Sequence, residues 1–141
     1  MRAVLKHLGL AGVLVIVSAV ALPVCAQQMA AERAHLTRYE RYAEPPVEQV
    51  HFFRIDGFEY LAPDRVAVWL GVNRMYLLTV ERPCINLALA NAIGLTARDG
   101  MLRAKFDAVT FDHQRCQITA ITPVNELQMK RNAARAAKAS G

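Results

Sequence analysis

Serine is almost absent from this 141-residue sequence, and after residue 26 the only one is the penultimate residue, Ser140. A serine nucleophile inside a folded domain is therefore excluded. The sequence also contains no G-x-S-x-G nucleophile elbow, no G-x-x-x-x-G-K phosphate loop and no G-x-G-x-x-G dinucleotide fingerprint. These absences argue against serine hydrolysis and nucleotide chemistry, and we expect no cofactor.

Residues that bind metals are also few, with three cysteines and four histidines in the chain. No two cysteines have the C-x-x-C spacing of a zinc site. His113 precedes Cys116 by three residues, but one histidine and one cysteine do not make a site. We therefore expect no metal.

The net charge of +5 comes from 17 basic and 12 acidic side chains, and a basic protein invites a nucleic-acid or membrane partner. The excess lies at the two ends of the chain, because residues 1–26 hold two of the basic side chains and residues 130–141 hold four. Residues 27–129 contain 11 basic and 12 acidic side chains. The central part is thus nearly neutral, and we predict no nucleic-acid partner.

The first 26 residues have the pattern of a secretory signal peptide: two basic residues, an apolar run of about 15 residues and a small-residue cleavage site at Val24-Cys25-Ala26. We predict cleavage after Ala26, a periplasmic location and no transmembrane segment after cleavage. A permanent anchor is one alternative, although a membrane span needs about 20 apolar residues. Acylation of Cys25 as a lipoprotein is the other, and Val24 is larger than the residue that such signals place before the cysteine.

Signal cleavage would leave two cysteines, Cys84 and Cys116, in an exported chain. An oxidising compartment favours a disulfide between them. A metal pair and a catalytic thiol are the alternatives, and neither cysteine has the neighbours that these need.

Short runs of β-branched and aromatic residues between turn signals predict an antiparallel meander with further strands after it. The predicted strands are 50–55, 58–61, 65–70, 75–80, 95–97, 101–104, 106–111 (separate, or continuous with the one before) and 116–121. Asp56-Gly57 and Arg98-Asp99-Gly100 are predicted hairpin turns. A short helix is predicted over 87–93, begun by Asn86 and ended by Gly94.

The fold class that follows is mainly β (α+β), a small antiparallel β-barrel or sandwich of about six to seven strands. A short N-terminal helix, the internal helix and a C-terminal helix accompany the strands. The predicted organisation is a signal peptide (1–26), an N-terminal helix and linker (27–46), a β-rich domain (47–123) and a basic, Ala-rich helix or tail (124–141).

The C-terminal segment is predicted to begin with Thr122 as N-cap and Pro123 at the first helical position. Its basic side chains share a side with Leu127, so the segment has no wide apolar face. We expect a frayed, solvated tail. Weak attraction to anionic envelope surfaces is the alternative.

Trp69, Arg74 and Tyr76 are the candidate binding residues, because they flank the predicted turn 71–74 and aromatic and arginine side chains dominate protein interfaces. The alternative is that Trp69 is the largest core side chain of the β region. No catalytic residue is predicted. An enzyme using paired carboxylates or histidines would have to draw on Asp99, Asp107, Asp112, His35, His51 and His113.

An ordered series of short motifs resembles a family of small exported proteins of Gram-negative bacteria that carry a domain of unknown function. The series is Phe52-Phe53-Arg54-Ile55-Asp56-Gly57-Phe58, Ala67-Val68-Trp69, Tyr76-Leu77-Leu78, Pro83-Cys84, Ala92-Ile93-Gly94-Leu95-Thr96, Ala104-Lys105-Phe106-Asp107 and Arg115-Cys116-Gln117-Ile118. It spans about Tyr39 to Val124. The resemblance implies export and paired cysteines, and it implies no activity. Many members of the family look like lipoproteins, and Val24 departs from their pattern.

The leading hypothesis is a non-enzymatic accessory or binding protein of the periplasm or cell envelope, with an envelope protein as its partner. One alternative, by analogy of size and compartment, is a periplasmic protein inhibitor of the lysozyme-inhibitor kind that inserts the 71–74 turn into an enzyme cleft. A small enzyme using aspartate and histidine is the second alternative.

Overall fold

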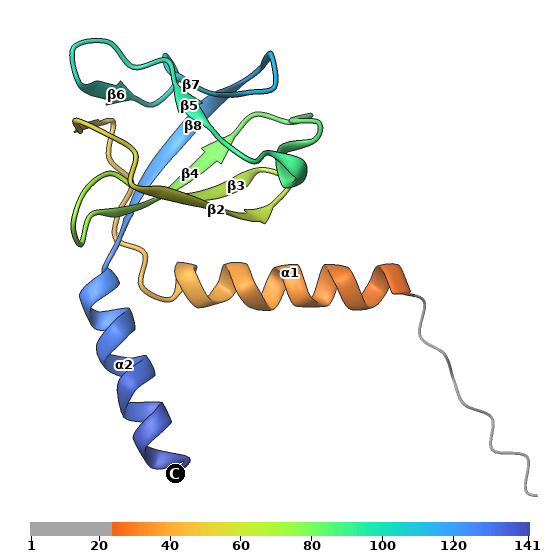
Figure 1. Ribbon diagram of the computed structural model, residues 1–141, viewed down its shortest axis with the longest axis vertical. Coiled ribbons are helices and arrows are strands. Elements are labelled where there is room, and N and C mark those ends of the chain that lie inside the picture. Colours follow the sequence, from red (N-terminus) through yellow and green to blue (C-terminus); the bar gives the residue numbers. More distant parts are fainter. Residues whose placement is uncertain (1–23) are drawn as a thin grey trace, which may run out of the picture.

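The computed structural model describes residues 24–141 (Figure 1). The chain begins there with helix α1 (Val24–Glu40), which is exposed along most of its length and buries Tyr39. The basic start and the apolar run of the predicted signal peptide lie outside the described residues. Its predicted cleavage site falls in the first turn of α1, where Cys25 is exposed and forms no disulfide.

Eight short strands form two antiparallel sheets, as the mainly β prediction requires. The strands are β1 (Gln49–His51), β2 (Gly57–Ala62), β3 (Arg65–Trp69), β4 (Met75–Val80), β5 (Gly94–Leu95), β6 (Met101–Arg103), β7 (Ala108–Phe111) and β8 (Gln114–Val124). The larger sheet has the order β2-β3-β4-β8-β7-β5, and the smaller one pairs β1 with β6. Figure 1 shows the larger sheet curling into a half-barrel around the long strand β8.

Alternation along the strands gives the larger sheet two apolar faces. On one face Val66, Val68 and Leu78 join the main core, which Val50 and Leu102 of the smaller sheet complete. On the other face a second core of buried residues contains Tyr39, Leu61, Ala67, Met75, Leu77 and Val124. The larger sheet is therefore the middle layer, with the small sheet on one side of it.

The second core is covered by α1 and by the C-terminal helix α2 (Glu126–Ala139), which lie on the side of the molecule away from β6 (Figure 1). The hydroxyl of Tyr39 donates a hydrogen bond to Glu59 of β2, and Nε2 of His35 lies 3.1 Å from the same carboxylate. Burial and the bond to Glu59 raise the pKa of Tyr39 far above its ordinary value. These contacts attach the C-terminal half of α1 to the sheet.

Several predicted elements are confirmed with small shifts of their ends. The strand predicted over 75–80 has those bounds, and β3 and β7 lie within the predicted 65–70 and 106–111. The antiparallel succession β2-β3-β4 is the predicted meander.

The Asp56-Gly57 hairpin is wrong, because the strands on either side of it do not pair. Gly57 is the first residue of β2 and lies opposite Trp69, while β1 pairs with β6. Val50 and Leu102 face each other in that ladder and are both buried in the main core. Burial of these two side chains decides the pairing, and residues 52–56 become a connecting loop.

The Arg98-Asp99-Gly100 turn is present, and the amide of Met101 donates to the carbonyl of Arg98 at 3.0 Å. The strands that flank it nevertheless diverge, because β5 pairs with β7 and β6 pairs with β1. The predicted turn therefore forms, but the predicted pairing of the two strands beside it is wrong.

The internal helix predicted over 87–93 begins at Leu87 after Asn86, as predicted, but it is a single 3₁₀ turn, η1 (Leu87–Leu89), and Asn86 has a left-handed backbone (φ 63°) and makes no side-chain cap. The predicted start of the C-terminal helix is wrong. Thr122 and Pro123 belong to β8, where Pro123 pairs with Tyr76. The cap of α2 is Asn125, whose side-chain oxygen accepts a hydrogen bond from the amide of Gln128 at 3.0 Å.

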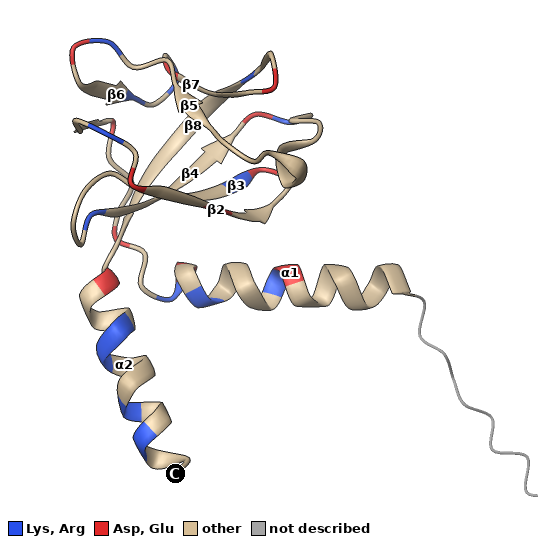
Figure 2. Ribbon diagram, viewed as in Figure 1, with Lys and Arg blue, Asp and Glu red and all other residues tan. Residues whose placement is uncertain are grey.

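The C-terminal segment is an ordered helix to Ala139, not a frayed tail. Its first turns are attached to the domain, since Glu126 is buried and the side-chain amide of Asn132 donates to the hydroxyl of Tyr42 at 3.2 Å. Beyond Asn132 the side chains are exposed. Figure 2 shows basic residues on this helix beyond its first turn, which carries the acidic Glu126.

The predicted disulfide between Cys84 and Cys116 is confirmed, with 5.7 Å between the two Cα atoms and 32 residues of sequence separation. Both cysteines are buried in the main core. Cys84 lies between β4 and η1, and Cys116 lies in β8 opposite Val109. The bond holds the segment after the meander against β8.

Replacement of Cys84 by serine should lower the free energy of unfolding of the oxidised protein by roughly 3 to 4 kcal/mol, because the unfolded chain loses a closed loop. Urea denaturation of oxidised wild type and Cys84→Ser measures this difference. Under reducing conditions the two proteins should unfold at nearly the same urea concentration. Equal stability of the oxidised proteins would contradict the contribution of the bond.

Candidate functional site

The structure brings two of the three predicted binding residues together and separates the third. Arg74 lies over the ring of Tyr76, with 6.0 Å from its Cζ to the ring centre, on the main-core side of β4. Trp69 pairs with Met75, one residue out of phase with Tyr76, and packs against the second core on the opposite face. The three side chains therefore do not form one surface.

Arg74 attaches the turn between β3 and β4 to strand β1. Its guanidinium donates to the carbonyl of His51 at 2.5 Å and to the hydroxyl of Tyr76 at 3.3 Å. At the tip of the turn Val72 is 82% exposed. Arg74 thus stabilises the turn, and Val72 is the side chain that the turn presents to solvent.

Trp69 serves as an anchor for α2. Its indole Nε1 donates to Oε1 of Glu126 at 3.2 Å, and Nζ of Lys130 lies 2.6 Å from the same oxygen. The alternative that Trp69 is the largest core side chain of the β region is met only in part, because Trp69 is half-buried and packs against the second core beneath the helices.

The carboxylates and histidines of the enzyme alternative lie in different places. Asp107 precedes β7, whereas Asp112 and His113 form the turn at the other end of that strand. At the rise of an extended strand, five residues separate Asp107 from Asp112 by roughly 16 Å. Across residues 24–141 no group of three His, Cys, Asp or Glu side chains could hold a metal ion.

Phe53 in the loop after β1 and Phe106 in the loop between β6 and β7 are both largely exposed, and Phe106 also lines two hollows. The Phe106 side chain is 76% exposed, and Lys105 beside it has a left-handed backbone (φ 68°). The sequence prediction placed Phe106 at the start of the strand 106–111, whereas in the structure it lies in the loop before β7 (Ala108–Phe111). No periodic signal marks the residue as exposed, because its exposure depends on how the loop bends at Lys105.

Backbone hydrogen bonds fix this loop to its neighbours. The amide of Lys105 donates to the carbonyl of Ile118 at 2.6 Å, and the amide of Ala104 donates to the carbonyl of Glu48 at 2.8 Å. The side-chain amide of Gln117 donates to the carbonyl of Lys105. The bend that exposes Phe106 is therefore held from both sides, by β8 and by the segment before β1.

The buried carboxylate of Asp107 closes the base of the loop. Its Oδ2 accepts from the amide of Arg103 at 2.7 Å, and its Oδ1 accepts from the hydroxyl of Thr96 at 3.2 Å. The hydroxyl of Thr96 in turn accepts from the amide of Ala108 at 2.9 Å. Asp107 is 8% exposed, and both of its oxygens have partners. The sequence flagged Asp107 as a catalytic candidate, and its contacts are those of a structural residue.

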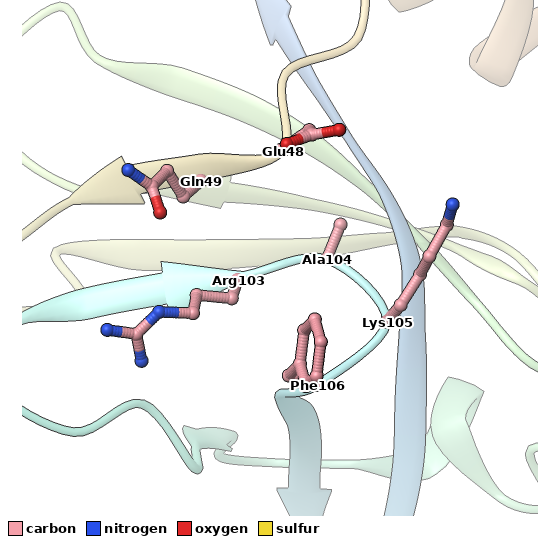
Figure 3. Close-up of a pocket in the computed structure, with 6 residues that line it drawn as sticks. All are labelled: Glu48, Gln49, Arg103, Ala104, Lys105 and Phe106. Atoms are coloured by element: carbon pink, nitrogen blue, oxygen red, sulfur yellow. The ribbon is translucent and has the colours of Figure 1, made fainter.

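Two hollows meet at Phe106 and Arg103. The first, of about 310 Å³, is also lined by Glu48, Gln49, Ala104 and Lys105, and Figure 3 shows the phenyl ring between the Arg103 and Lys105 side chains. The second, of about 270 Å³, is also lined by Thr96, Arg98, Asp107 and Arg115. We define the β6–β7 site as Phe106 and these two hollows. It lies on the side of the molecule away from the two helices (Figure 1).

Residues 6–140 match the profile of a family of unknown function, DUF6491. The chain belongs to this family. Membership of DUF6491 confirms the predicted resemblance to a family of unknown function and extends it over both helices. We found no match among curated proteins and none among solved structures. The DUF6491 match thus covers both helices and the strands between them, and the family description assigns no activity.

Neither helix described for this DUF6491 chain, within residues 24–141, combines the length and the apolar character that crossing a bilayer requires.

A further hollow of about 360 Å³ lies between α1 and the turn after β2, and the charges at its edge are paired within the chain. Asp64 lies 3.0 Å from Nη1 of Arg65 and 3.0 Å from Nη2 of Arg82. Partial burial alone would raise the pKa of Asp64, but the hydrogen bond from Arg82 and the two positive charges outweigh it and lower the pKa. These contacts stabilise the turn.

The lowered pKa of Asp64 makes its contribution to stability depend on pH. The contribution is present above the ordinary carboxyl pKa of about 3.9 and is lost as the pH falls through the folded-state value. Asp64→Asn should therefore destabilise the protein at neutral pH by up to about 1 kcal/mol, and the difference should shrink below about pH 3. Urea denaturation of both proteins at the two pH values tests this. A difference that stays constant or grows in acid would contradict it.

Proposed function

We propose that this protein is a non-enzymatic binding protein of the periplasm, and that it holds an envelope partner at the β6–β7 site. The observation that carries the proposal is the exposed phenyl ring of Phe106 on a loop that is hydrogen-bonded at its base and on both sides. A large apolar side chain presented in this way has no role in the stability of its own domain.

The energetics of association favour such a loop. Burial of an exposed phenylalanine side chain contributes about 1.5 to 3 kcal/mol, whereas ordering a flexible loop on binding costs free energy. The bonds from Lys105 to Ile118 and from Arg103 to Asp107 order the loop in the free protein. A partner that covers Phe106 therefore gains the apolar contact without that cost.

The compartment is proposed from two features that agree. The start of the sequence has the pattern of a signal peptide. The Cys84–Cys116 disulfide is the kind of bond that persists in an oxidising compartment.

The absence of catalysis is part of the proposal. Asp107 has both carboxylate oxygens occupied by Arg103 and Thr96, and His113 lies at the other end of β7. His35 contacts Glu59 and Tyr39 beneath the sheet. None of these contacts pairs a free base with an acid across a shared cavity.

Insertion of the β3–β4 turn into an enzyme cleft, as in a protein inhibitor, is a second candidate. It is favoured by the exposure of Val72 at the tip of a turn that Arg74 holds in place. The apolar tip, Val72, is smaller than Phe106, so we place it second.

Site-specific photo-crosslinking in cells distinguishes the two surfaces. A benzophenone amino acid in place of Phe106 should give a discrete covalent adduct with one envelope protein, and the same amino acid in place of Val72 should give none. The adduct should disappear when an excess of the untagged wild-type protein is expressed in the same cells, since wild type competes for the partner. An adduct at position 72 alone would favour the inhibitor hypothesis, and no adduct at position 106 would contradict the proposal.

A further inference from the structure

We infer that the partner bound at the β6–β7 site is a protein that presents an acidic segment, with carboxylates held by Arg98, Arg103 and Arg115 and an apolar side chain packed on Phe106. This inference rests on the proposed function and specifies the chemistry of the partner.

The three arginines come from different parts of the chain and line the same hollow of about 270 Å³. Arg98 precedes the turn before β6, Arg103 ends β6, and Arg115 lies near the start of β8. The fold thus gathers three positive charges that are not neighbours in sequence.

These arginines make no ion pair with any residue of the described chain, 24–141. Three other arginines of the domain are paired, since Arg54 contacts Asp56, and Arg65 and Arg82 contact Asp64. Three guanidinium groups around one hollow repel each other, and a bound anion would relieve that repulsion.

Asp107 also lines the hollow and offsets one of the three positive charges. Its oxygens are already bonded to the amide of Arg103 and the hydroxyl of Thr96, so it does not form an ion pair with the guanidinium groups. A charge excess equivalent to two cations remains at the hollow, which suits one or two carboxylates. The planar guanidinium group binds a carboxylate through two parallel hydrogen bonds.

The first hollow favours a polypeptide over a uniformly anionic surface. Glu48 lines it together with Arg103 and Lys105, so this hollow has an acidic side chain among basic ones, and Phe106 lines both hollows. A membrane of anionic lipids would bring negative charge against the arginines and also against the carboxylate of Glu48, which would repel it. A peptide can place an apolar side chain on Phe106 and direct its carboxylates only toward the arginines.

The test is a titration of the oxidised, ¹⁵N-labelled protein without its signal peptide with the peptide Glu-Leu-Glu-Glu-Leu-Glu, followed by amide chemical shifts. We expect shifts at Lys105 and Phe106, and a dissociation constant raised about tenfold or more by the double substitution Arg98→Gln and Arg115→Gln. The matched control is the double substitution Arg135→Gln and Lys138→Gln on α2, which removes the same charge far from the site. This control should leave the dissociation constant within about twofold of wild type.

Each contrary result has a definite meaning. If the α2 control raises the dissociation constant as much as the substitution of Arg98 and Arg115 does, the peptide is attracted by net charge alone, and the inference is overturned. Tight binding of phosphatidylglycerol vesicles through Arg98 and Arg115, with no peptide binding, would overturn it in favour of a lipid. If Phe106→Ser raises the dissociation constant of the peptide and the arginine substitutions do not, the inference is overturned and the proposed binding site is retained. If neither Phe106→Ser nor the arginine substitutions raise it, the results contradict both the inference and the proposed function. Unchanged thermal melting of each variant verifies that the fold is retained.

Discussion

The carboxylate of Asp107 is the contact on which the geometry of the β6–β7 site depends. It accepts hydrogen bonds from the amide of Arg103 at the end of β6 and from the hydroxyl of Thr96 after β5. Its own backbone carbonyl accepts from the amide of Ile118 in β8 at 2.9 Å. One buried residue therefore joins three strands that are separate in sequence. A buried carboxylate without these donors would be strongly destabilising, so the carboxylate and the loop conformation require each other.

The two faces of the larger sheet pack against different parts of the protein. On one side, Tyr39 and Glu59 attach α1 while Trp69 and Glu126 attach α2. On the other side, the small sheet of β1 and β6 completes the main core, and the loop after β6 carries Phe106 to the surface. The Cys84–Cys116 disulfide lies in that main core and holds the chain between β4 and β5 against β8. The helices stabilise one face, and the opposite side remains open to a partner.

Local features of the fold could be predicted from the sequence, and pairings between distant segments could not. The strand at Met75–Val80 is a short run of apolar, aromatic and β-branched residues between turn residues, which is local information. The disulfide followed from counting the cysteines that remain after the predicted signal peptide. The partner of β1 depends instead on the joint burial of Val50 and Leu102, which are far apart in sequence. Asp56-Gly57 has the composition of a hairpin turn, and the burial of distant side chains outweighed that preference.

The candidate site was missed for a similar reason. Phe106 begins a predicted strand, 106–111, and nothing near it in the sequence shows that Lys105 bends the chain. Arg98, Arg103 and Arg115 are spread over three elements, so their convergence depends on the tertiary fold. Trp69, Arg74 and Tyr76 were close in sequence and rich in interface residues, but strand alternation placed Trp69 on the opposite face. Proximity in sequence was a poor guide to a shared surface here.

Native-state hydrogen exchange of the free protein tests most directly whether Asp107 orders the loop before any partner binds. The account predicts that the amides of Arg103 and Lys105 exchange slowly in wild type, because they donate to Asp107 and Ile118. In Asp107→Ala these two amides should lose protection, while those in the ladder between β3 and β4 keep theirs. Fast exchange of both amides in wild type, or unchanged protection in Asp107→Ala, would contradict the account.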